Sequence, residues 1–329
     1  MHSLSPRSKA PLSLSIVVPA FNEAHYLATF INELISTLDH EISNLEVIVV
    51  NDGSSDHTQA VLSNLCAADP RILGLNLSRN FGKESALSAG LDAARGEAVV
   101  LMDADGQHPP HLVLTMLEHW SQGYDVVYAV RKTRSDQTHL RINLTRIFYK
   151  LINWGNRVKI PLDAGDFRLM SRRVVDSIIS MPERNRFMKG LYAWVGYPSI
   201  AIDYTPLNRA YGVSKFGFND SFALAVTGIV SFSVAPLRML TFLGFFLSIA
   251  AMCYGCWVVF EYFFYGINVP GYATIVVGLM FFSGIQMLSV GILAEYVGRI
   301  YEEVKRRPRY IVAQKMGQGL QDPYKSSVF

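Results

Sequence analysis

Two long stretches near the C-terminus contain no charged residue, and they constrain the fold more than any other feature of the chain. They run from Met239 to Phe260 and from Tyr272 to Ala294. Each is at least as long as the roughly 20 residues that a helix needs to cross the apolar core of a bilayer. One such run could be the buried helix of a soluble core, but two in succession favour membrane-spanning helices. We therefore expect a transmembrane hairpin over residues 237–298, with spans at about 239–260 and 272–294.

Basic residues are distributed unevenly around this hairpin. The link Tyr265–Gly271 contains neither lysine nor arginine, whereas basic residues lie outside both runs: Arg238, Arg299, Lys305, Arg306, Arg307 and Arg309. Because basic flanks stay on the cytoplasmic side of a membrane, we expect both chain termini in the cytoplasm. Met1–Pro11 lacks the apolar core of a signal peptide. The three cysteines indicate no disulfide framework, which suits a reducing compartment.

Residues 1–218 alternate short apolar strands with helical patterns. Strands are predicted at Leu14–Pro19, Leu45–Asn51, Ile72–Ser78, Ala98–Asp103 and Asp125–Val130, and helices at roughly Glu23–Leu38, Asp56–Ala68 and Gly82–Ala94. Strands separated by single helices indicate an α/β fold with a mostly parallel, Rossmann-like sheet covered on both faces. Residues 219–236 are expected to form a juxtamembrane interfacial helix, and residues 299–329 a basic cytoplasmic tail. The net charge of +3 is too small to indicate a nucleic-acid partner.

Acidic residues follow three of the predicted strands. The first strand leads into Pro19–Glu23 (PAFNE), the second into Asn51–Asp56 (NDGSSD) and the fourth into Asp103–Asp105 (DAD). Each segment alone could be a helix cap or a turn. Ligands of such sheets bind beyond the carboxyl ends of the strands, so three acidic segments at that edge indicate a binding site.

The segment Asp103–Asp105 predicts a metal site. Its two carboxylates are one residue apart at a strand end, where both can reach one divalent cation, and Gln107 could add a neutral oxygen. Hard oxygen ligands of this kind suit Mg²⁺ or Mn²⁺. A cation held there could neutralise a diphosphate and stabilise it as a leaving group.

Six segments, taken in order, resemble the family 2 glycosyltransferases with a GT-A fold. They are Val18–Glu23 (VPAFNE), Val50–Asp56 (VNDGSSD), Asn80–Lys83 (NFGK), Met102–Pro110 (MDADGQHPP), Ala164–Leu169 (AGDFRL) and Arg209–Lys215 (RAYGVSK). Within that family the chain is similar to the polyprenyl-phosphate branch, which includes bactoprenol glucosyltransferases and dolichol-phosphate mannose synthases. With the terminal hairpin, the resemblance covers nearly the whole chain.

The resemblance implies a role for individual residues. Pro19, Phe21, Glu23 and Asp52 would hold the base and ribose of a nucleotide, and Asp103, Asp105 and Gln107 the metal, with the Ala104 backbone at the nucleotide. Arg131 would face phosphate, and Arg209 and Lys215 would belong to a loop that closes over the donor diphosphate and the acceptor phosphate. Two positions depart from the pattern. Phe21 stands where tyrosine is common, and Gly106 stands where leucine is frequent, a change we expect to matter little.

Asp166 has two open interpretations. The resemblance implies that Asp166 and Asp105 both lie at the reacting centre, with Asp166 as a proposed general base. A phosphate monoester already carries about −1.5 to −2 charges near neutral pH, so it needs no proton removal to act as a nucleophile. Asp166 could instead hold a cation, orient the acceptor, or form a structural ion pair with Arg168.

The function implied by the resemblance is that of a metal-dependent, inverting hexosyltransferase. It would move a sugar from a nucleotide-sugar, with UDP-glucose as the first candidate, onto undecaprenyl or another polyprenyl phosphate. The product would be a lipid-linked sugar donor for cell-envelope glycan modification. The enzyme would be a multi-pass protein of the inner membrane with its catalytic domain in the cytoplasm. Its partners would be a separate flippase, a downstream glycosyltransferase and further copies of itself, in a homo-oligomer such as a tetramer.

Two other classes of function are compatible with parts of the sequence. A processive polysaccharide synthase shares the first three motifs, but it normally carries a Gln-x-x-Arg-Trp motif, and none of the four tryptophans here follows an arginine. A catalytically silent membrane scaffold could retain the fold, but it has no reason to keep clustered carboxylates, which repel one another. The basic amphipathic pattern of Leu140–Val158 fits either a membrane surface or the outside of the sheet.

Overall fold

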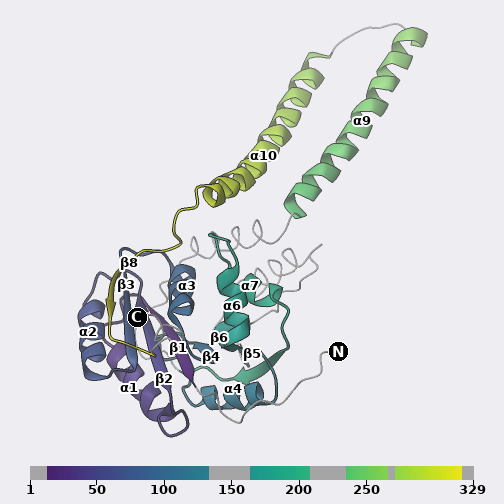
Figure 1. Cartoon of the computed structure of the whole chain (residues 1–329). Helices are drawn as coiled ribbons and strands as arrows, with labels where there is room; N and C mark the ends of the chain where they lie inside the picture. The colour runs from purple at the N-terminus through teal and green to yellow at the C-terminus, as the bar shows by residue number, and fades with distance from the viewer. Residues whose placement is uncertain (1–12, 133–163, 208–234, 266–270, 321–329) are drawn as a thin grey trace, which may run out of the picture.

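The computed structural model describes residues 13–132, 164–207, 235–265 and 271–320. Over these residues an eight-stranded sheet lies between two layers of helices, and two long helices extend away from this α/β domain (Figure 1). Several predictions fall outside the described residues: Arg209, Lys215 and the amphipathic helix at 140–158. The predicted helix at 219–236 reaches the described residues only at positions 235 and 236.

The core of the sheet consists of four parallel strands. These are β1 (Leu14–Ala20), β2 (Leu45–Asn51), β3 (Ile72–Leu77) and β4 (Ala98–Leu101), arranged in the order β4-β1-β2-β3. Their residues are almost all buried because helices cover both faces. The predicted mostly parallel α/β sheet is therefore confirmed.

Three more strands extend the sheet beyond β4. β6 (Ala164–Ser171) pairs antiparallel with both β4 and β5 (Val126–Arg131), and β7 (Ser199–Tyr204) pairs parallel with β5. Successive residues of a strand point to opposite faces of the sheet. Asp166 and Arg168 therefore share one face of β6, and Phe167 lies on the other.

In the described part of the chain, six helices cover the sheet. One layer contains α1 (Leu27–Leu38), α2 (Thr58–Ala68) and α4 (Leu112–Ser121), and the other contains α3 (Lys83–Ala93), α6 (Arg172–Ser180) and α7 (Met188–Trp194). The second layer lies on the side of the sheet nearer the two long helices (Figure 1).

Two of these helices begin later than the sequence predicts. α1 begins at Leu27 because Asn22 adopts a positive φ of 55° and the residues around it bond to the loop after β2. α2 begins at Thr58, since Asp56 stays outside the helix and accepts a hydrogen bond from the backbone N–H of Thr58 at 3.0 Å. The residues that precede the two helices, 23–26 and 56–57, thus belong to the loops at the carboxyl ends of the strands.

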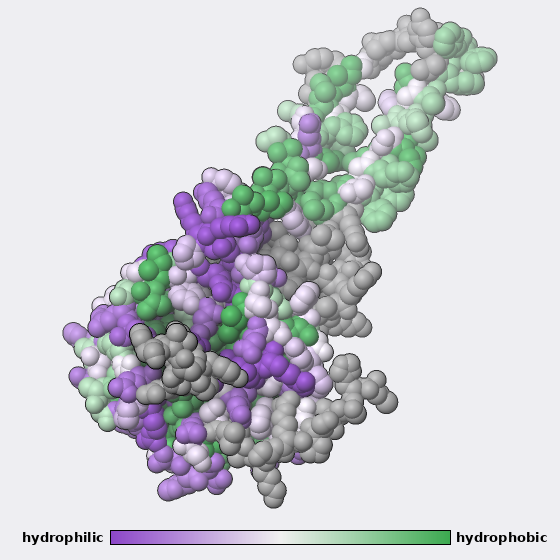
Figure 2. Space-filling view, in the orientation of Figure 1, coloured by the Kyte–Doolittle hydropathy of each residue, from purple (hydrophilic) through white to green (hydrophobic). Residues whose placement is uncertain are grey.

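The two long helices are α9 (Ala235–Tyr265) and α10 (Tyr272–Val304). Both are long and apolar enough to cross a membrane, over Met239–Val258 and Val277–Val304, and none of either segment is buried inside the protein. Figure 2 shows hydrophobic residues along both helices, whereas hydrophilic residues dominate the visible face of the α/β domain. Apolar surface of this extent fits contact with lipid rather than water.

After α10 the chain returns to the α/β domain and adds a strand to its sheet. β8 (Val312–Met316) pairs antiparallel with β3 at the edge, although the sequence indicated only a basic tail here. The Tyr310 hydroxyl donates to Asp92 at 2.6 Å, and the backbone N–H of Leu320 donates to Glu46 at 2.8 Å. The second apolar helix is thus anchored to the domain by the segment that follows it.

Candidate functional site

The loops after β1, β2 and β3 are joined into one rim. The backbone N–H of Asn22 donates to Ser54 Oγ, and that of Ser55 donates to Asn22 Oδ1, both at 2.8 Å. Gly53 has a φ of 62°, and a Cβ at this position would lie 2.3 Å from the carbonyl carbon of Arg79. Only glycine permits this close approach, so the rim depends on it.

Asp52 connects this rim to the start of α3. Its carboxylate accepts backbone N–H bonds from Phe81 at 2.8 Å and Gly82 at 2.9 Å. Burial raises the pKa of Asp52, and these two hydrogen bonds with the nearby Arg79 partly offset the rise. Asp52 therefore fixes the loop that leads into Lys83, a structural contact that the sequence did not predict.

Lys83, the first residue of α3, bridges two of the predicted site residues. Its Nζ lies 2.7 Å from Oδ1 and 2.9 Å from Oδ2 of Asp103, and 2.9 Å from Oδ2 of Asp166. Burial lowers the pKa of Lys83, but the two carboxylates outweigh it, and the pKa lies above its ordinary value. Burial likewise opposes the ionisation of Asp103 and Asp166, yet Lys83 brings the pKa of each below its ordinary value. The site thus contains an ammonium held between two ionised carboxylates.

Asp166 pairs with Lys83 rather than with Arg168. Arg168 lies over the Tyr192 ring, with 3.6 Å between its Cζ and the ring centroid, and donates to the Gly165 carbonyl. Within the described part of the chain, three buried polar atoms around this cluster have no hydrogen-bond partner: Asp166 Oδ1, Arg168 Nε and Tyr192 Oη. Buried polar atoms are usually paired, so these three atoms are candidates for contact with a polar ligand.

His108 holds the backbone of the acidic loop. Its Nδ1 accepts the backbone N–H of Asp103 at 3.0 Å, and its ring stacks on Phe167 with centroids 4.6 Å apart. Burial lowers the pKa of His108, although Asp103 and Asp105 act in the opposite direction. A neutral ring leaves Nδ1 free to accept a hydrogen bond. The sequence analysis assigned no role to this residue, although it lies in the segment Met102–Pro110.

Gln107 and Arg131 contact each other at the end of the same loop. Arg131 Nη2 donates to Gln107 Oε1 at 3.1 Å, and Arg131 Nε lies 3.3 Å from the Tyr204 hydroxyl. The backbone N–H of Gln107 donates to Asp105 Oδ1 at 3.1 Å. The expected phosphate-facing arginine therefore lies beside the expected metal ligands.

Gly106 makes room for Tyr26. Its φ is 74°, and a Cβ would lie 2.7 Å from Cε1 of the Tyr26 ring. The pKa of Tyr26 is raised by burial and, to a smaller extent, by Glu33 and Asp105. The glycine that departs from the family pattern thus permits both a backbone conformation and an aromatic contact next to Asp105.

The remaining predicted residues lie on or near the same rim. Pro19 is in β1, Phe21 and Glu23 are in the loop that follows it, and Ala104 is buried between the two aspartates of the acidic motif. The structure therefore gathers the described candidates at one edge of the sheet and brings Asp103 and Asp166 into contact with the same lysine.

The oxygen donors of the acidic loop fit a divalent cation that brings other ligands with it. Among the residues that the structure describes, no group of three His, Cys, Asp or Glu side chains could hold a metal ion. Asp103, Asp105 and Gln107 nevertheless offer two carboxylates and one amide oxygen on a single loop. Mg²⁺ is typically bound by one or two carboxylates together with substrate phosphates and water. The donor set therefore fits an ion that arrives with a diphosphate.

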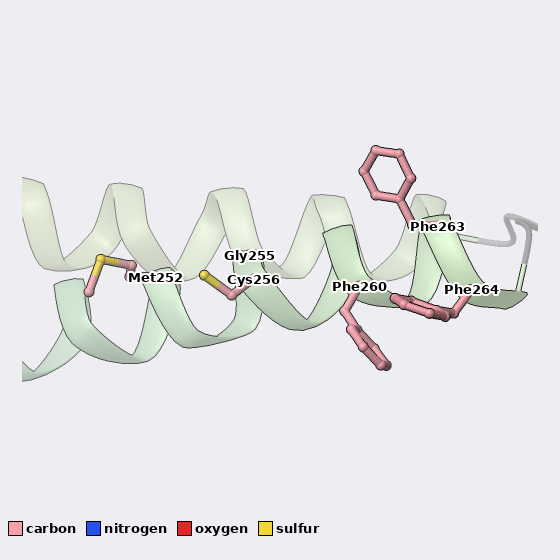
Figure 3. Close-up of a pocket in the computed structure, with 6 residues that line it drawn as sticks. All are labelled: Met252, Gly255, Cys256, Phe260, Phe263 and Phe264. Atoms are coloured by element: carbon pink, nitrogen blue, oxygen red, sulfur yellow. The ribbon is translucent and has the colours of Figure 1, made fainter.

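An apolar hollow on α9 is unrelated to this chemistry. It is lined by Met252, Gly255, Cys256, Phe260, Phe263 and Phe264, near the end of α9 farther from the α/β domain (Figure 3). These residues include no charged side chain that could bind phosphate. The rim of the sheet, and not this hollow, carries the polar groups of a reaction site.

The fold and the site together define the class of the protein. A mostly parallel sheet between two helix layers, with an acidic DxD loop after β4 and a site at the strand ends, is the arrangement of a GT-A glycosyltransferase. More narrowly, the chain belongs to glycosyl transferase family 2, whose family model matches residues 15–179.

Curated relatives match over nearly their whole length. An uncharacterized glycosyltransferase of Synechocystis sp. is 42% identical over 306 residues, which cover 93% of this chain and 96% of the relative. A prophage-derived bactoprenol glucosyl transferase of Shigella flexneri is 41% identical over 301 residues, covering 92% and 97%. A prophage bactoprenol glucosyl transferase homolog of Escherichia coli is 40% identical over 301 residues, covering 92% and 98%.

Among solved structures, the chain is similar to a mannosyltransferase from Pyrobaculum calidifontis in complex with GDP-Man and Mn2+. The identity is 18%, the TM-score is 0.45, and the alignment covers 93% of this chain and 91% of the other.

Proposed function

We propose that this chain transfers a sugar from a nucleotide-sugar to a polyprenyl phosphate, with UDP-glucose and undecaprenyl phosphate as the first candidates. The observation that carries the proposal is the extent of the match to bactoprenol glucosyl transferases. It spans 92% of this chain at about 41% identity, and so includes the apolar helices as well as the α/β domain. An acceptor that is itself a membrane lipid explains why a glycosyltransferase domain is joined to such helices.

Donor binding is assigned to the rim. Pro19, Phe21, Glu23 and Asp52 would hold the base and ribose, with Asp52 acting at least in part through the loop that it fixes. The phosphates would be bound by Arg131 and by the Ala104 backbone, with Arg209 and Lys215 closing over them. Cationic side chains hold phosphate oxygens through charge-assisted hydrogen bonds.

Asp103, Asp105 and Gln107 would hold Mg²⁺ or Mn²⁺. When bound, the cation would neutralise the diphosphate as it leaves with the bonding electrons of the anomeric C–O bond. Within the protein, His108 fixes the Asp103 backbone, and Gln107 in turn is fixed by Arg131.

The acceptor phosphate would attack the anomeric carbon from the face opposite the diphosphate, which inverts the configuration. A phosphate oxygen forms the new bond to the sugar, and the nucleoside diphosphate departs. The phosphate is already anionic, so Asp166 is not needed as a base. Asp166 would instead hold Lys83 and use its unpartnered Oδ1 to orient a bound group.

The arrangement of the chain supports a cytoplasmic catalytic domain on a two-span anchor. In the last turn of α10, Glu303 accepts backbone N–H bonds from Arg184 at 2.8 Å and Asn185 at 3.1 Å, and β8 then joins the sheet. The end of the second span must therefore face the same side of the membrane as the domain, and a short hairpin returns the first span there too. On this basis we propose a catalytic unit over residues 1–218, an interfacial helix over 219–236, a hairpin over 237–298 and a C-terminal segment over 299–329 that completes the sheet.

The remaining partners follow from the product. A lipid-linked sugar made on the cytoplasmic face needs a separate flippase and a downstream glycosyltransferase before it can modify a cell-envelope glycan. The exposed apolar faces of α9 and α10 also suit association with further copies of the chain.

The direct test uses the purified full-length chain in detergent with undecaprenyl phosphate and a panel of labelled nucleotide-sugars. We expect label from one donor to enter the lipid phase, with transfer abolished by EDTA and reduced at least 100-fold by Asp105→Asn. Lys315→Met, which changes an exposed residue of the edge strand β8, is the control and should retain activity. Failure of every donor, in protein that binds no nucleotide, would contradict the proposal.

A further inference from the structure

Lys83 occupies the coordinating oxygens that a metal ion would need. Both oxygens of Asp103 lie within 2.9 Å of its Nζ, and a third carboxylate oxygen, from Asp166, lies at 2.9 Å. An ammonium has three hydrogens to donate. The two oxygens of Asp103 are too close together to take one hydrogen each, so Asp103 and Asp166 can each hold one hydrogen of Lys83. In this state Asp103 is neutralised by the protein itself.

We propose that Lys83 is an internal counter-ion that competes with the divalent cation for Asp103 and moves onto Asp166 when cation and nucleotide bind. The inference rests on the proposed function, because it takes Asp103 as a metal ligand. Lys83 is a positioning residue in this scheme: it holds the two aspartates together when no ion is bound and releases one of them to the incoming ion.

The position of Asp166 allows this exchange without leaving the ammonium unpaired. Asp166 Oδ1 has no partner among the described residues, although it is buried, while Oδ2 already accepts from Lys83. When Asp103 turns to a metal ion, the ammonium can stay on Asp166, whose two oxygens can both accept from it. The hydrogen that Asp103 releases then becomes available to an anionic oxygen of a bound substrate, where a cation offsets the repulsion between donor and acceptor phosphates.

The backbone around Lys83 is built to hold the lysine in place. Lys83 begins α3, and the two residues before it are fixed by the Asp52 carboxylate. The loop therefore need not move when the side chain changes partner. Only the long, flexible stem of the lysine has to rotate, whereas Asp103 remains anchored through His108.

Competition has a consequence for metal binding that a purely structural salt bridge lacks. In the wild-type protein a cation must displace an ammonium from Asp103, so Mn²⁺ alone should bind weakly and nucleotide should strengthen it. Removal of the ammonium leaves Asp103 and Asp166 without the cation that bridges them. A variant without Lys83 should therefore be less stable when empty, yet bind Mn²⁺ more tightly.

The test measures Mn²⁺ binding to the full-length chain without nucleotide, by electron paramagnetic resonance of the free ion. We expect Lys83→Met to bind Mn²⁺ at least 10-fold more tightly than wild type, and Lys83→Arg, which keeps the charge, to stay within about threefold. Lys315→Met removes an equal charge from an exposed position in β8, at the edge of the sheet beyond β3, and its affinity should also stay within about threefold. Unchanged or weaker Mn²⁺ binding by Lys83→Met would overturn the proposal.

Thermal unfolding keeps the test decisive if Lys83→Met is poorly folded. Saturating Mn²⁺ should raise the melting temperature of Lys83→Met more than that of wild type, and the double variant Lys83→Met/Asp103→Asn should lose this gain. A melting temperature of Lys83→Met that does not respond to Mn²⁺ contradicts the competition. Sugar transfer by the wild type is measured separately, so its failure would count against the proposed function and not against competition for Asp103.

Discussion

Glu84 is the neighbour of Lys83 in the chain and lies beside the same charged cluster. Its Oε2 accepts the backbone N–H of Met188 at 3.0 Å, which ties α3 to the start of α7. Burial and the nearby Asp166 raise the pKa of Glu84 from 4.5 to about 7. At neutral pH this glutamate therefore holds a proton for a large part of the time, whereas it would be ionised in the unfolded chain.

The raised pKa predicts a pH dependence of stability. A folded-state pKa above the unfolded value means that the contribution is complete below pH 4.5 and is lost as the pH rises through 7. Over this window the free energy of unfolding should fall by up to about 3 kcal/mol through Glu84 alone. Glu84→Gln, which retains an acceptor for Met188, should flatten the dependence in thermal melts at pH 5 to 8. Identical pH profiles of the two proteins would contradict the assignment.

The close contact between Gly106 and Tyr26 leads to a second prediction for a single residue. Alanine at this position must adopt a φ of 74° and place its Cβ against Tyr26, which should cost about 1–2 kcal/mol. Gly106→Ala should lower the melting temperature and weaken nucleotide binding in the presence of Mn²⁺, because Asp105 and Gln107 flank the altered backbone. Addition of Tyr26→Ala should relieve the steric part only. A wild-type melting temperature and nucleotide affinity for Gly106→Ala would show that the rim tolerates a side chain there.

Among the elements, β8 is the one whose attachment can be tested most simply. Gly317 follows the strand with a φ of 76°, and a Cβ there would lie 2.1 Å from the carbonyl oxygen of Ile72. Gly317→Ala should therefore loosen β8 from β3 at a cost of about 2 kcal/mol, which corresponds to a loss of roughly 4–8 °C in melting temperature.

Limited trypsin digestion reports on β8 directly. Loosening of the strand should speed cleavage after Lys315 in Gly317→Ala, as followed by mass spectrometry. Gly298→Ala is the matched control, since a Cβ at Gly298 meets no atom within 4 Å and the change lies in α10. Equal cleavage rates in the two variants would mean that β8 is not held through this contact.

The sequence predicted the central elements because their patterns are local. The four buried parallel strands appear as short β-branched runs, and the two apolar helices as long charge-free runs. β8 has neither pattern: Val312–Met316 is a five-residue, mostly exposed edge strand that contains a lysine, as edge strands often do. Its position depends on pairing with β3, some 240 residues earlier in the chain. A pattern of neighbouring residues cannot predict a pairing over that separation.

The same limit applies to the site. The carboxylates at the strand ends were predictable because topology brings the ends of parallel strands to one edge. The ion-pair partners of these carboxylates were not predictable. Lys83 contacts Asp166 only because β6 inserts antiparallel between β4 and β5. Sequence spacing offered Arg168 as the partner of Asp166, two residues away on the same strand face, but that arginine stacks on Tyr192 instead.

At the scale of the whole molecule, the return of the chain to its sheet bears on the orientation proposed for the hairpin. Because α10 ends at the α/β domain, a hairpin that crosses a membrane as proposed would place the link between α9 and α10 on the far side. In intact cells, Asn268→Cys in that link should react with a membrane-impermeant maleimide, whereas Lys305→Cys should react only after permeabilisation. Both variants are made in a background with Cys66, Cys253 and Cys256 replaced by serine. Reaction of Lys305→Cys in intact cells would contradict the proposed orientation.

The central claim is that the acceptor is the phosphate of a polyprenyl lipid, and the most direct measurement compares acceptors that differ only at that group. Release of nucleoside diphosphate from the preferred labelled donor would be followed with undecaprenyl phosphate, undecaprenol or undecaprenyl diphosphate in the same detergent. We predict rapid release with the monophosphate, stoichiometric with labelled lipid, and at least 100-fold less with the alcohol, which lacks the anionic nucleophile. Equal rates with the alcohol and the monophosphate, or release without any lipid product, would contradict the proposed reaction.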